Sequence, residues 1–348
     1  MTDIRLTLKA EWEPQSEILL VWPDRHTDWE YMLDEVRKCV AAILEALRRH
    51  GSKISLLVRD PAEPLEYLSE DVLQGLTLVK TEYNDTWIRD YGPLSLTLEG
   101  AGDKRALLAD FGFNGWGLKF ASDLDNLVTY RCFSHHSDGS LNPAYLNCRG
   151  YELEGGSVET DGRGTLLTTS RCLCSPNRNG GLSKDQVERR LARLLGIRHF
   201  LWLDHGYLAG DDTDSHIDTL ARLCPGDVII YTACHDNEDE HYSELQAMAT
   251  QLKEMRTPEG KPYSLVELPL PSPFYDPDDG HRLPATYANY LVTDNAILVP
   301  VYGRPEEDRM ALDIIRSVYS DREVEGIDCR ALIRQHGSLH CATMQLNR

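Results

Sequence analysis

One local pattern recurs about five times along the chain: a short apolar strand, an amphipathic helix and a second apolar strand. The first copy begins with EILLVWP at 17–23, continues through a helix that ends at Gly51, and closes with KISLLVRD at 53–60. Apolar side chains recur at helical spacing in that helix, which is typical of one face packed on a core. Later copies centre on TLLTTS, DVIIYT and AILVPVYG, and a less regular one lies around 106–150.

A short extended segment precedes each apolar strand and is joined to it by a turn, so each unit is predicted to be a hairpin, a helix and a strand. The last hairpin is incomplete, because HGSLHCATMQLNR at 336–348 supplies only an opening strand. Its missing partner is the strand at 17–23, so the two ends are expected to pair and close a ring. This predicts one domain over residues 1–348 with a central site. The segments 233–241 and 271–284 are predicted to be surface loops that could cover a pocket.

Composition narrows the classes of function. With 36 Lys and Arg against 56 Asp and Glu, the net charge is −20, which disfavours nucleic acids and anionic membranes and favours small cations. No stretch approaches the roughly 18 apolar residues of a membrane span, and the N-terminus lacks a signal-peptide pattern, so a cytoplasmic protein is expected. The nine dispersed cysteines indicate reduced thiols without the paired spacing of a zinc site, and the GxGxxG and HExxH motifs are missing, so no metal or other cofactor is expected.

The predicted opening strands carry polar side chains where they are expected to face the central axis. They contribute Asp90, Glu154, His216, Asp218 and Cys341. On a strand, His216 and Asp218 would point to the same face, because one residue separates them. Taken singly, the cysteine is more typical of a buried small hydrophobe and the histidine of a structural hydrogen-bonding residue. Together, one thiol, one imidazole and three carboxylates from separate repeats indicate an active site.

This set of side chains suits attack on a guanidinium carbon. Two carboxylates can hold a planar guanidinium from two sides, and the Cys341 thiolate can then attack its carbon. A protonated His216 favours the thiolate and can donate a proton to the departing amine. The neutral imidazole can then activate water against an S-alkylthiouronium intermediate, which gives a ureido product. A Cys-His-Asp protease uses the same residue types but does not require two additional acids.

Several motifs surround these residues. They are AEWEPQSEILLVWP at 10–23, NDTWIRDYGP at 84–93, FGFNGWG at 111–117, LEGGSVETDGRGTLLTT at 153–169, SPNRN at 175–179, DDTDSHID at 211–218 and HC at 340–341. Over nearly its whole length the chain resembles the agmatine deiminase family, which is grouped with the bacterial-type peptidylarginine deiminases in the guanidine-modifying superfamily. The resemblance implies a five-bladed pseudosymmetric α/β propeller of the pentein type, in agreement with the ring expected from the repeats.

The resemblance also implies a role for each candidate. Asp90 of WIRD and Asp218 of HID would hold the guanidinium. His216 would act as an acid and then as a base, and Glu154 of EGG would orient it. Cys341 would be the nucleophile.

Four further residues fall in matching motifs near the family's pocket. The resemblance implies that they line it or meet a distal ammonium: Trp87, Trp116, Asp85 and Asp212. Two departures lie near the cysteine. HGSLHC stands where GGGNIHC is usual, keeping Gly337 but replacing an adjacent glycine with His336, and DSHID stands where DGHVD is usual. Both changes bear on which guanidine enters the pocket.

The favoured substrate is agmatine, hydrolysed to N-carbamoylputrescine and ammonia, because an acidic pocket suits both of its charges. Free arginine or a C-terminal peptidyl arginine, giving citrulline, is the alternative, and it would require a cation such as Arg89 or Arg178 for the carboxylate. Lesser alternatives are an amidinotransferase and a non-catalytic polyamine- or arginine-binding protein, which need not keep both His216 and Cys341. The expected partner is a small cationic guanidine rather than a nucleic acid or a membrane, and a homo-oligomer is compatible with the sequence.

Overall fold

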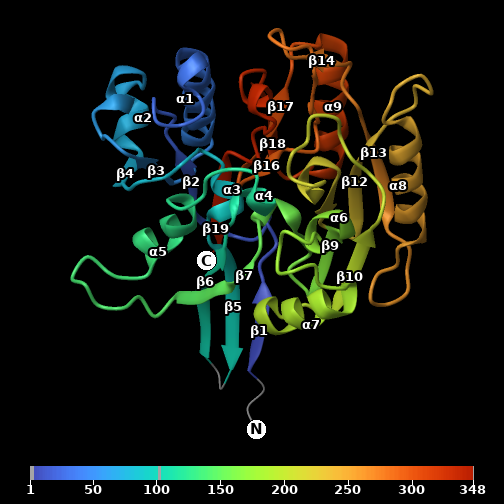
Figure 1. The fold of residues 1–348 in the computed structure, drawn as a ribbon, viewed down its shortest axis with the longest axis horizontal. Coiled ribbons are helices and arrows are strands. Elements are labelled where there is room, and N and C mark those ends of the chain that lie inside the picture. The colour runs from blue at the N-terminus through green and yellow to red at the C-terminus, as the bar shows by residue number, and fades with distance from the viewer. Residues whose placement is uncertain (1–3, 101–102, 348) are drawn as a thin grey trace.

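Figure 1 shows a computed structural model of the chain, which describes residues 4–100 and 103–347. Within those residues the strands form six sheets, and five of the sheets share one topology. In each of the five, a middle strand pairs antiparallel with one neighbour and parallel with the other. The antiparallel pair is the predicted hairpin and the parallel neighbour is the predicted closing strand, so the α/β class is confirmed.

The five hairpins lie at corresponding places in the five sheets. They are β19 (Thr343–Asn347) with β2 (Gln15–Val21), β5 (Leu94–Gly100) with β6 (Asp103–Gly112), β8 (Glu159–Thr160) with β9 (Thr165–Thr169), β11 (Ala221–Cys224) with β12 (Val228–Ala233), and β16 (Leu291–Val292) with β17 (Ala296–Val301). The parallel neighbours of their second strands are β3 (Ile54–Val58), β7 (Tyr145–Glu152), β10 (His199–Leu203), β13 (Ser264–Pro269) and β18 (Glu323–Asp328). Additional edge strands are β4 (Leu76–Lys80), which pairs with β3, and β1 (Arg5–Leu8), which pairs with β5.

Four long helices connect the parallel strands, as the periodicity predicts. They are α1 (Leu33–Arg49), α7 (Lys184–Leu195), α8 (Tyr242–Glu254) and α9 (Pro305–Val318). In α1, Asp34 and Glu35 lie in the first turn and Arg48 and Arg49 in the last, which matches the helix dipole. Gly51 follows this helix with a φ of +78°, a left-handed conformation that glycine adopts without strain. The remaining helices are short: α2 (Glu70–Gln74), α3 (Ile88–Tyr91), α4 (Gly115–Leu118), α5 (Val128–Phe133) and α6 (Ser170–Leu173).

The pairing of the two chain ends is confirmed. β19 runs antiparallel to β2, with Thr343 opposite Leu20 and Leu346 opposite Glu17. Met344 and Leu346 are buried in the main apolar core, which extends through most of the repeats. The last strand is therefore part of the packed interior.

The unit between β6 and β7 is the irregular one that the sequence predicts. It contains α4 and α5 in place of a long amphipathic helix. Trp116, Gly117 and Leu118 have φ values of +54°, +82° and +68°, and the Asn114 side chain accepts a hydrogen bond from the Gly117 amide at 2.9 Å. This compact turn carries Trp116 inward, where its ring is buried.

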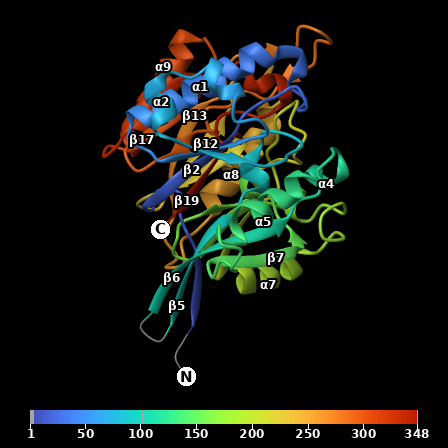
Figure 2. The same ribbon diagram turned by 90° about the vertical axis from the view of Figure 1, so that its left-hand side faces the viewer.

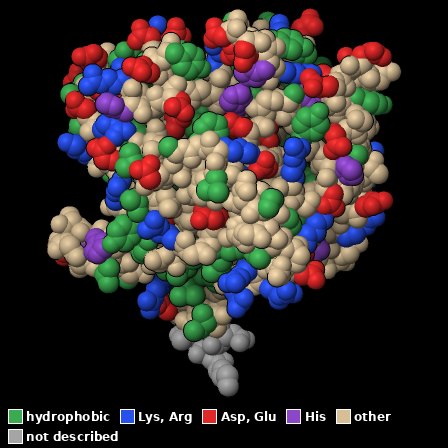
Figure 3. All heavy atoms as spheres, viewed as in Figure 1, with side chains coloured by type: hydrophobic (Ala, Val, Ile, Leu, Met, Phe, Trp, Pro, Cys, Tyr) green, Lys and Arg blue, Asp and Glu red, His purple; other side chains and the backbone are tan. Residues whose placement is uncertain are grey.

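The strands β5 and β6 extend away from the rest of the molecule beside β1 (Figure 2). Acidic and basic side chains are interspersed over the face in Figure 3. Within the described residues, no helix has both the length and the apolar character needed to cross a membrane.

The predicted surface loop at 271–284 contains a small hairpin of β14 (Phe274–Tyr275) and β15 (Arg282–Leu283). The Arg334 guanidinium contacts Asp276 and Asp278 of this hairpin, each at 2.8 Å. The hairpin is thereby connected to the segment that leads to Cys341.

Candidate functional site

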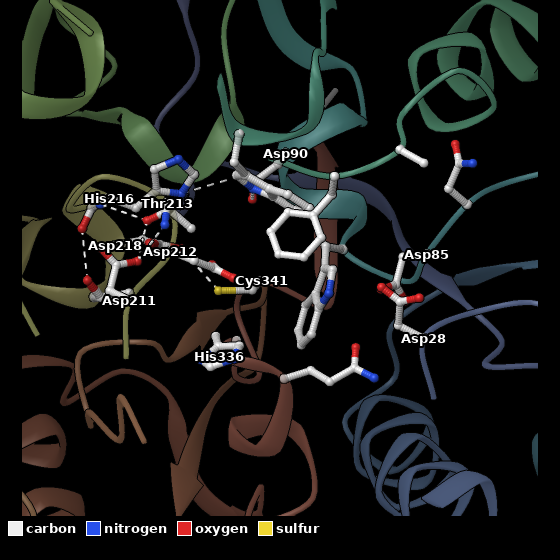
Figure 4. Close-up of a pocket in the computed structure, with 18 of the residues that line it drawn as sticks. Asp28, Asp85, Asp90, Asp211, Asp212, Thr213, His216, Asp218, His336 and Cys341 are labelled. Carbon is white, nitrogen blue, oxygen red and sulfur yellow. Dashed lines mark hydrogen bonds and ion pairs between the residues drawn. The ribbon is translucent and has the colours of Figure 1, made fainter. Parts of the chain in front are cut away.

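A cavity of about 380 Å³ lies where five chain segments meet (Figure 4). These segments are 26–31, 84–90, 116–121, 211–219 and 335–341. Eight of the nine residues predicted for the site line the cavity: Cys341, His216, Asp90, Asp218, Trp87, Trp116, Asp85 and Asp212. The ninth, Glu154, lies behind His216, with its Oε2 atom 3.5 Å from the imidazole Nε2.

The local conformation of these residues differs from the prediction. None of the five central candidates lies within a strand: Asp90 is in α3, Glu154 and His216 each precede a short 3-10 turn, Asp218 is inside such a turn, and Cys341 precedes β19. The expectation that His216 and Asp218 share a strand face is therefore wrong. Each hairpin strand begins only after a turn, because glycine, aspartate and serine in these motifs favour turns over extended chain.

Gly156 shows why the EGG motif requires a turn without side chains. A Cβ atom on Gly156 would lie 2.6 Å from His216 Nδ1 and 2.9 Å from Asp90 Oδ1, closer than non-bonded atoms approach. The Gly156 amide donates a hydrogen bond to the same Asp90 oxygen at 2.9 Å. The glycine therefore lets the imidazole and the carboxylate come together.

The His216 side chain is buried between two carboxylates. Its Nδ1 atom lies 3.6 Å from Asp90 Oδ1 and its Nε2 atom 3.5 Å from Glu154 Oε2, and neither nitrogen has a hydrogen bond within the described structure. Burial alone would lower the pKa of His216, but the charge of Asp90 and the contacts with Cys172 and Glu154 raise it well above its usual range. The geometry therefore favours an imidazolium that is free to donate protons.

Glu154 is kept ionised by Arg178. The Arg178 Nε atom lies 2.8 Å from both Glu154 oxygens, and its Nη1 atom lies 2.6 Å from Asp214. Burial would raise the pKa of Glu154, but His216 and Arg178 hold it below its usual range. The thiol of Cys172 also approaches Glu154, at 3.7 Å, so Glu154, Cys172 and His216 have the donor types of a metal site. Because Arg178 already occupies both Glu154 oxygens, this cluster is better described as an ion-pair network.

Asn289 connects Cys341 to Asp218. One atom of its amide faces two backbone N–H groups, from His340 at 2.9 Å and Cys341 at 3.3 Å, so this atom is the oxygen. The amide nitrogen then donates to Cys341 Sγ at 3.3 Å and to Asp218 Oδ2 at 3.2 Å. Asn289 thus fixes the backbone at the cysteine and directs a donor at its sulfur.

The surroundings of Cys341 disfavour a thiolate. Burial raises the pKa of the Cys341 thiol well above its usual range, and the negative charges of Asp218 and Asp90 add to the shift. A cation placed between these two carboxylates would reverse both charge effects. The site therefore couples thiol ionisation to the arrival of a cation.

A second group of carboxylates lies away from Cys341. Asp28 and Asp85 point toward each other there (Figure 4). Burial, together with the nearby charge of Asp28, raises the pKa of Asp85 to about 7, despite the hydrogen bond that Asp85 accepts from the Thr86 amide. Burial also raises the pKa of Asp212 to about 6, and His336 opposes that shift. Carboxylate side chains, which attract cations when they are ionised, therefore lie both near Cys341 and at the end of the cavity away from it.

His336, at the position of one departure from the family pattern, lines the cavity. Its φ of +67° keeps a left-handed backbone that glycine adopts more readily, and its ring stacks on His281 with centroids 5.2 Å apart. Gly337 is retained because a Cβ atom there would lie 2.3 Å from the Trp87 ring.

Sequence reasoning missed Asn289, Asp28 and His340. The repeats held a signal for Asn289, because it precedes the opening strand β16 as Asp218 precedes β11 and Cys341 precedes β19. Asp28 and His340 carry no comparable signal, since their roles depend on contacts between distant segments. The two arginines considered for a substrate carboxylate, Arg89 and Arg178, do not line the cavity.

Solved structures of the pentein superfamily share this α/β fold over nearly the whole chain. The chain belongs to the Porphyromonas-type peptidyl-arginine deiminase family, whose sequence model matches residues 7–346.

Individual relatives agree with this assignment. The agmatine deiminase of C. jejuni, solved with substrate bound, is 33% identical with a TM-score of 0.88, covering 99% of this chain and 97% of that one. A proposed arginine deiminase of Porphyromonas gingivalis is 46% identical with a TM-score of 0.90 and 99% coverage of both chains. A proposed agmatine deiminase of Yersinia pseudotuberculosis is 31% identical, over 97% of this chain and 94% of its own length.

Proposed function

We propose that this protein is a hydrolase that deiminates agmatine, with N-carbamoylputrescine and ammonia as products. One observation carries the choice of substrate: the cavity has carboxylates at both ends, and among the described residues that line it there is no lysine or arginine. Agmatine is a dication and matches both ends. The carboxylate of arginine would meet negative charge instead. The names of the C. jejuni and Yersinia relatives agree with this substrate.

The guanidinium binds between Asp90 and Asp218. The Asp218 Oδ1 atom is buried without a hydrogen bond within the described structure, while Oδ2 is occupied by Asn289. Asp90 is held by the Trp116 indole N–H at 2.8 Å and by the Gly156 amide. Two preorganised carboxylates favour a planar cation and fix its carbon near the Cys341 sulfur.

The first chemical step forms a covalent intermediate. With the guanidinium in place, Cys341 releases its proton to solvent and the resulting thiolate attacks the central carbon, forming a C–S bond. His216 donates a proton to one amino group, the C–N bond breaks, and ammonia leaves. An S-alkylthiouronium remains on Cys341.

Hydrolysis completes the cycle. The neutral His216 accepts a proton from water, and the resulting hydroxide attacks the thiouronium carbon. The C–S bond breaks, the Cys341 thiolate departs with its electron pair and accepts the proton of the new hydroxyl group, and the neutral ureido product is released. Glu154 orients His216 and stabilises its charged form.

The distal ammonium of agmatine binds at the second group of carboxylates. Asp85 and Asp28 provide the negative charge and Trp87 packs along the carbon chain, whereas Asp212 lines the cavity on the side of Asp218 (Figure 4). Since protonated Asp85 carries no charge, arrival of the ammonium displaces that proton.

We propose a single domain, 1–348, built as a five-bladed pseudosymmetric α/β propeller, supported by the five equivalent sheets and the pairing of β19 with β2. A cytoplasmic location is supported by the odd number of dispersed cysteines. A homo-oligomer is compatible with this domain organisation and with this location.

The decisive experiment incubates the protein with agmatine, free arginine and a peptide ending in arginine, and measures ammonia and ureido product for each. Agmatine is expected to be the best substrate by kcat/KM. Cys341→Ala is expected to lower turnover by at least about 10⁴-fold, because it removes the nucleophile. Mass spectrometry of quenched wild-type enzyme is expected to show the thiouronium on Cys341.

Other outcomes discriminate among the alternatives. Preference for the arginine peptide would replace agmatine with a peptidyl substrate, and dependence on an added amine acceptor would indicate an amidinotransferase. Tight binding of agmatine without turnover would indicate a binding protein.

A further inference from the structure

Behind Asp218 lies a buried chain of charged groups that the proposed chemistry does not use. His340 Nδ1 is 2.8 Å from Asp218 Oδ2, and His340 Nε2 is 2.8 Å from Glu11 Oε2. Glu11 in turn is 2.7 Å from Arg222 Nη2, and Arg222 also pairs with Glu159. Each of these side chains is more than nine-tenths buried.

The contacts fix the protonation of His340. Both ring nitrogens face carboxylate oxygens, which accept hydrogen bonds, so both nitrogens carry hydrogen and the ring is an imidazolium. In a neutral ring, Nε2 could accept a hydrogen bond from Arg222, 3.2 Å away. The lone pair of Nε2 would then also face the Glu11 oxygen, which repels it. Glu11 stays ionised, because Arg222 and the Val292 amide, at 2.6 Å, both donate to it.

Charges from several elements meet at His340. Glu11 comes from the segment after β1, Asp218 from the turn before β11, and Arg222 from β11 itself. The Arg89 side chain of α3 donates to the His340 carbonyl at 3.2 Å. Burial would raise the pKa of Glu11, but His340 and Arg222 lower it far below its usual range.

The two carboxylate oxygens of Asp218 have different surroundings as a result. Its Oδ2 atom accepts from His340 and Asn289, whereas its Oδ1 atom has no hydrogen-bond partner among the described residues, and the side chain lines the cavity. Burial would raise the pKa of Asp218, but His340 lowers it below the usual range. One oxygen is thus anchored and the other is directed at the substrate.

We infer that His340 is a positioning residue: held as an imidazolium between Glu11 and Asp218, it keeps Asp218 ionised and aims its free oxygen at the guanidinium. This inference rests on the proposed function, in which Asp218 binds that group. His340 touches no substrate and acts through Asp218 alone. Glu11, outside the cavity, acts one contact further away by keeping His340 charged.

The test compares pH profiles of agmatine deimination for His340→Gln, Glu11→Gln and the wild type. Activity falls as pH falls through the pKa of Asp218, and losing the imidazolium raises that pKa. His340→Gln is therefore expected to move the acid limb of kcat, measured with saturating agmatine so that protonation of Asp85 does not set it, upward by about one pH unit or more and to lower kcat about tenfold on that limb. Glu11→Gln is expected to shift the limb in the same direction by less. His235→Gln, which breaks an exposed pair with Glu267, is the matched control and should leave the profile unchanged.

A uniform loss at every pH with an unmoved acid limb would overturn the inference, and so would an unaltered profile. A second measurement does not depend on activity or on variants that fold. In ¹⁵N-histidine NMR spectra of the wild-type protein, both His340 nitrogens should carry hydrogen, as the contacts with Asp218 and Glu11 require. A neutral ring there would overturn the inference even if agmatine is the substrate. If no guanidine is deiminated but the ring is charged, the proposed function fails and the Glu11–His340–Asp218 arrangement stands.

Discussion

At the scale of residues, the cavity is governed by carboxylates in unlike surroundings. Asp218 is anchored by His340 and Asn289, whereas Asp85 faces the like charge of Asp28. The same side-chain type is therefore ionised at one end and partly protonated at the other near neutral pH. Under the proposed function, the guanidinium therefore binds at the Asp218 end over a wide pH range, whereas binding at the Asp85 end depends on pH.

Asp85 makes the Michaelis constant depend on pH. Its pKa of about 7 means that protons are expected to compete with the distal ammonium as the pH falls. In the wild type, KM for agmatine is expected to rise below about pH 7, while kcat changes less. Asp85→Asn should raise KM about tenfold at about pH 8, the cost of about 1.4 kcal/mol of lost attraction, and flatten its dependence near neutrality. Steady-state kinetics measured from below about pH 7 to about pH 8 checks both expectations, and the exposed Asp103→Asn variant is the control. An Asp85→Asn enzyme with wild-type KM would place the ammonium elsewhere.

Glu154 sets the pH above which proton donation fails. Its carboxylate is among the groups that raise the pKa of His216, so a neutral amide should let that pKa fall. Because the protonated imidazole donates to the leaving amine, Glu154→Gln is expected to shift the alkaline limb of kcat to lower pH by about one unit or more. The kcat profile with saturating agmatine measures this shift. A kcat profile that is lower at every pH but keeps its alkaline limb in place would show that Glu154 does not raise the pKa of His216.

At the scale of elements, the turn before each hairpin carries the site. Asp90, Glu154, Asp218, Asn289 and Cys341 each precede the opening strand of a different hairpin. The repeats made the hairpins and long helices predictable, because strand alternation and helical periodicity are local properties. The turns were predicted as strands, because a few polar residues between apolar runs fit both patterns.

Gly156 offers a sharp test of this turn geometry. Gly156→Ala places a Cβ against His216 Nδ1 and Asp90, so it should lower kcat/KM about 100-fold or more through displacement of the imidazole. Gly150→Ala on β7 is the matched control, since a Cβ there has no neighbour within 4 Å. Kinetics with agmatine, together with thermal melting of both variants, separates a local effect from unfolding. Equal activity of the two variants would contradict the geometry.

At the scale of the whole molecule, residues distant in sequence complete one another. Glu11 near the start, Arg222 in the middle and His340 near the end form one buried network. No sequence pattern links these three positions, because their contacts depend on how the units are arranged in space. The pairing of the ends was predictable for the opposite reason, since an unmatched strand at each end is visible in the repeats.

The pairing of β19 with β2 makes the last residues essential to folding. A chain ending at Ala342 keeps Cys341 but loses β19, including the buried Met344 and Leu346. Removing two such side chains costs about 2–5 kcal/mol each, against a total stability of about 5–15 kcal/mol, and it exposes the edge of β2. The truncated chain is therefore expected to lose cooperative thermal unfolding and activity together, as followed by circular dichroism and ammonia release. Cys341→Ala is the control, because it should lose activity and keep the wild-type melting temperature. A truncated chain that melts like the wild type would show that the fold is stable without its closing strand.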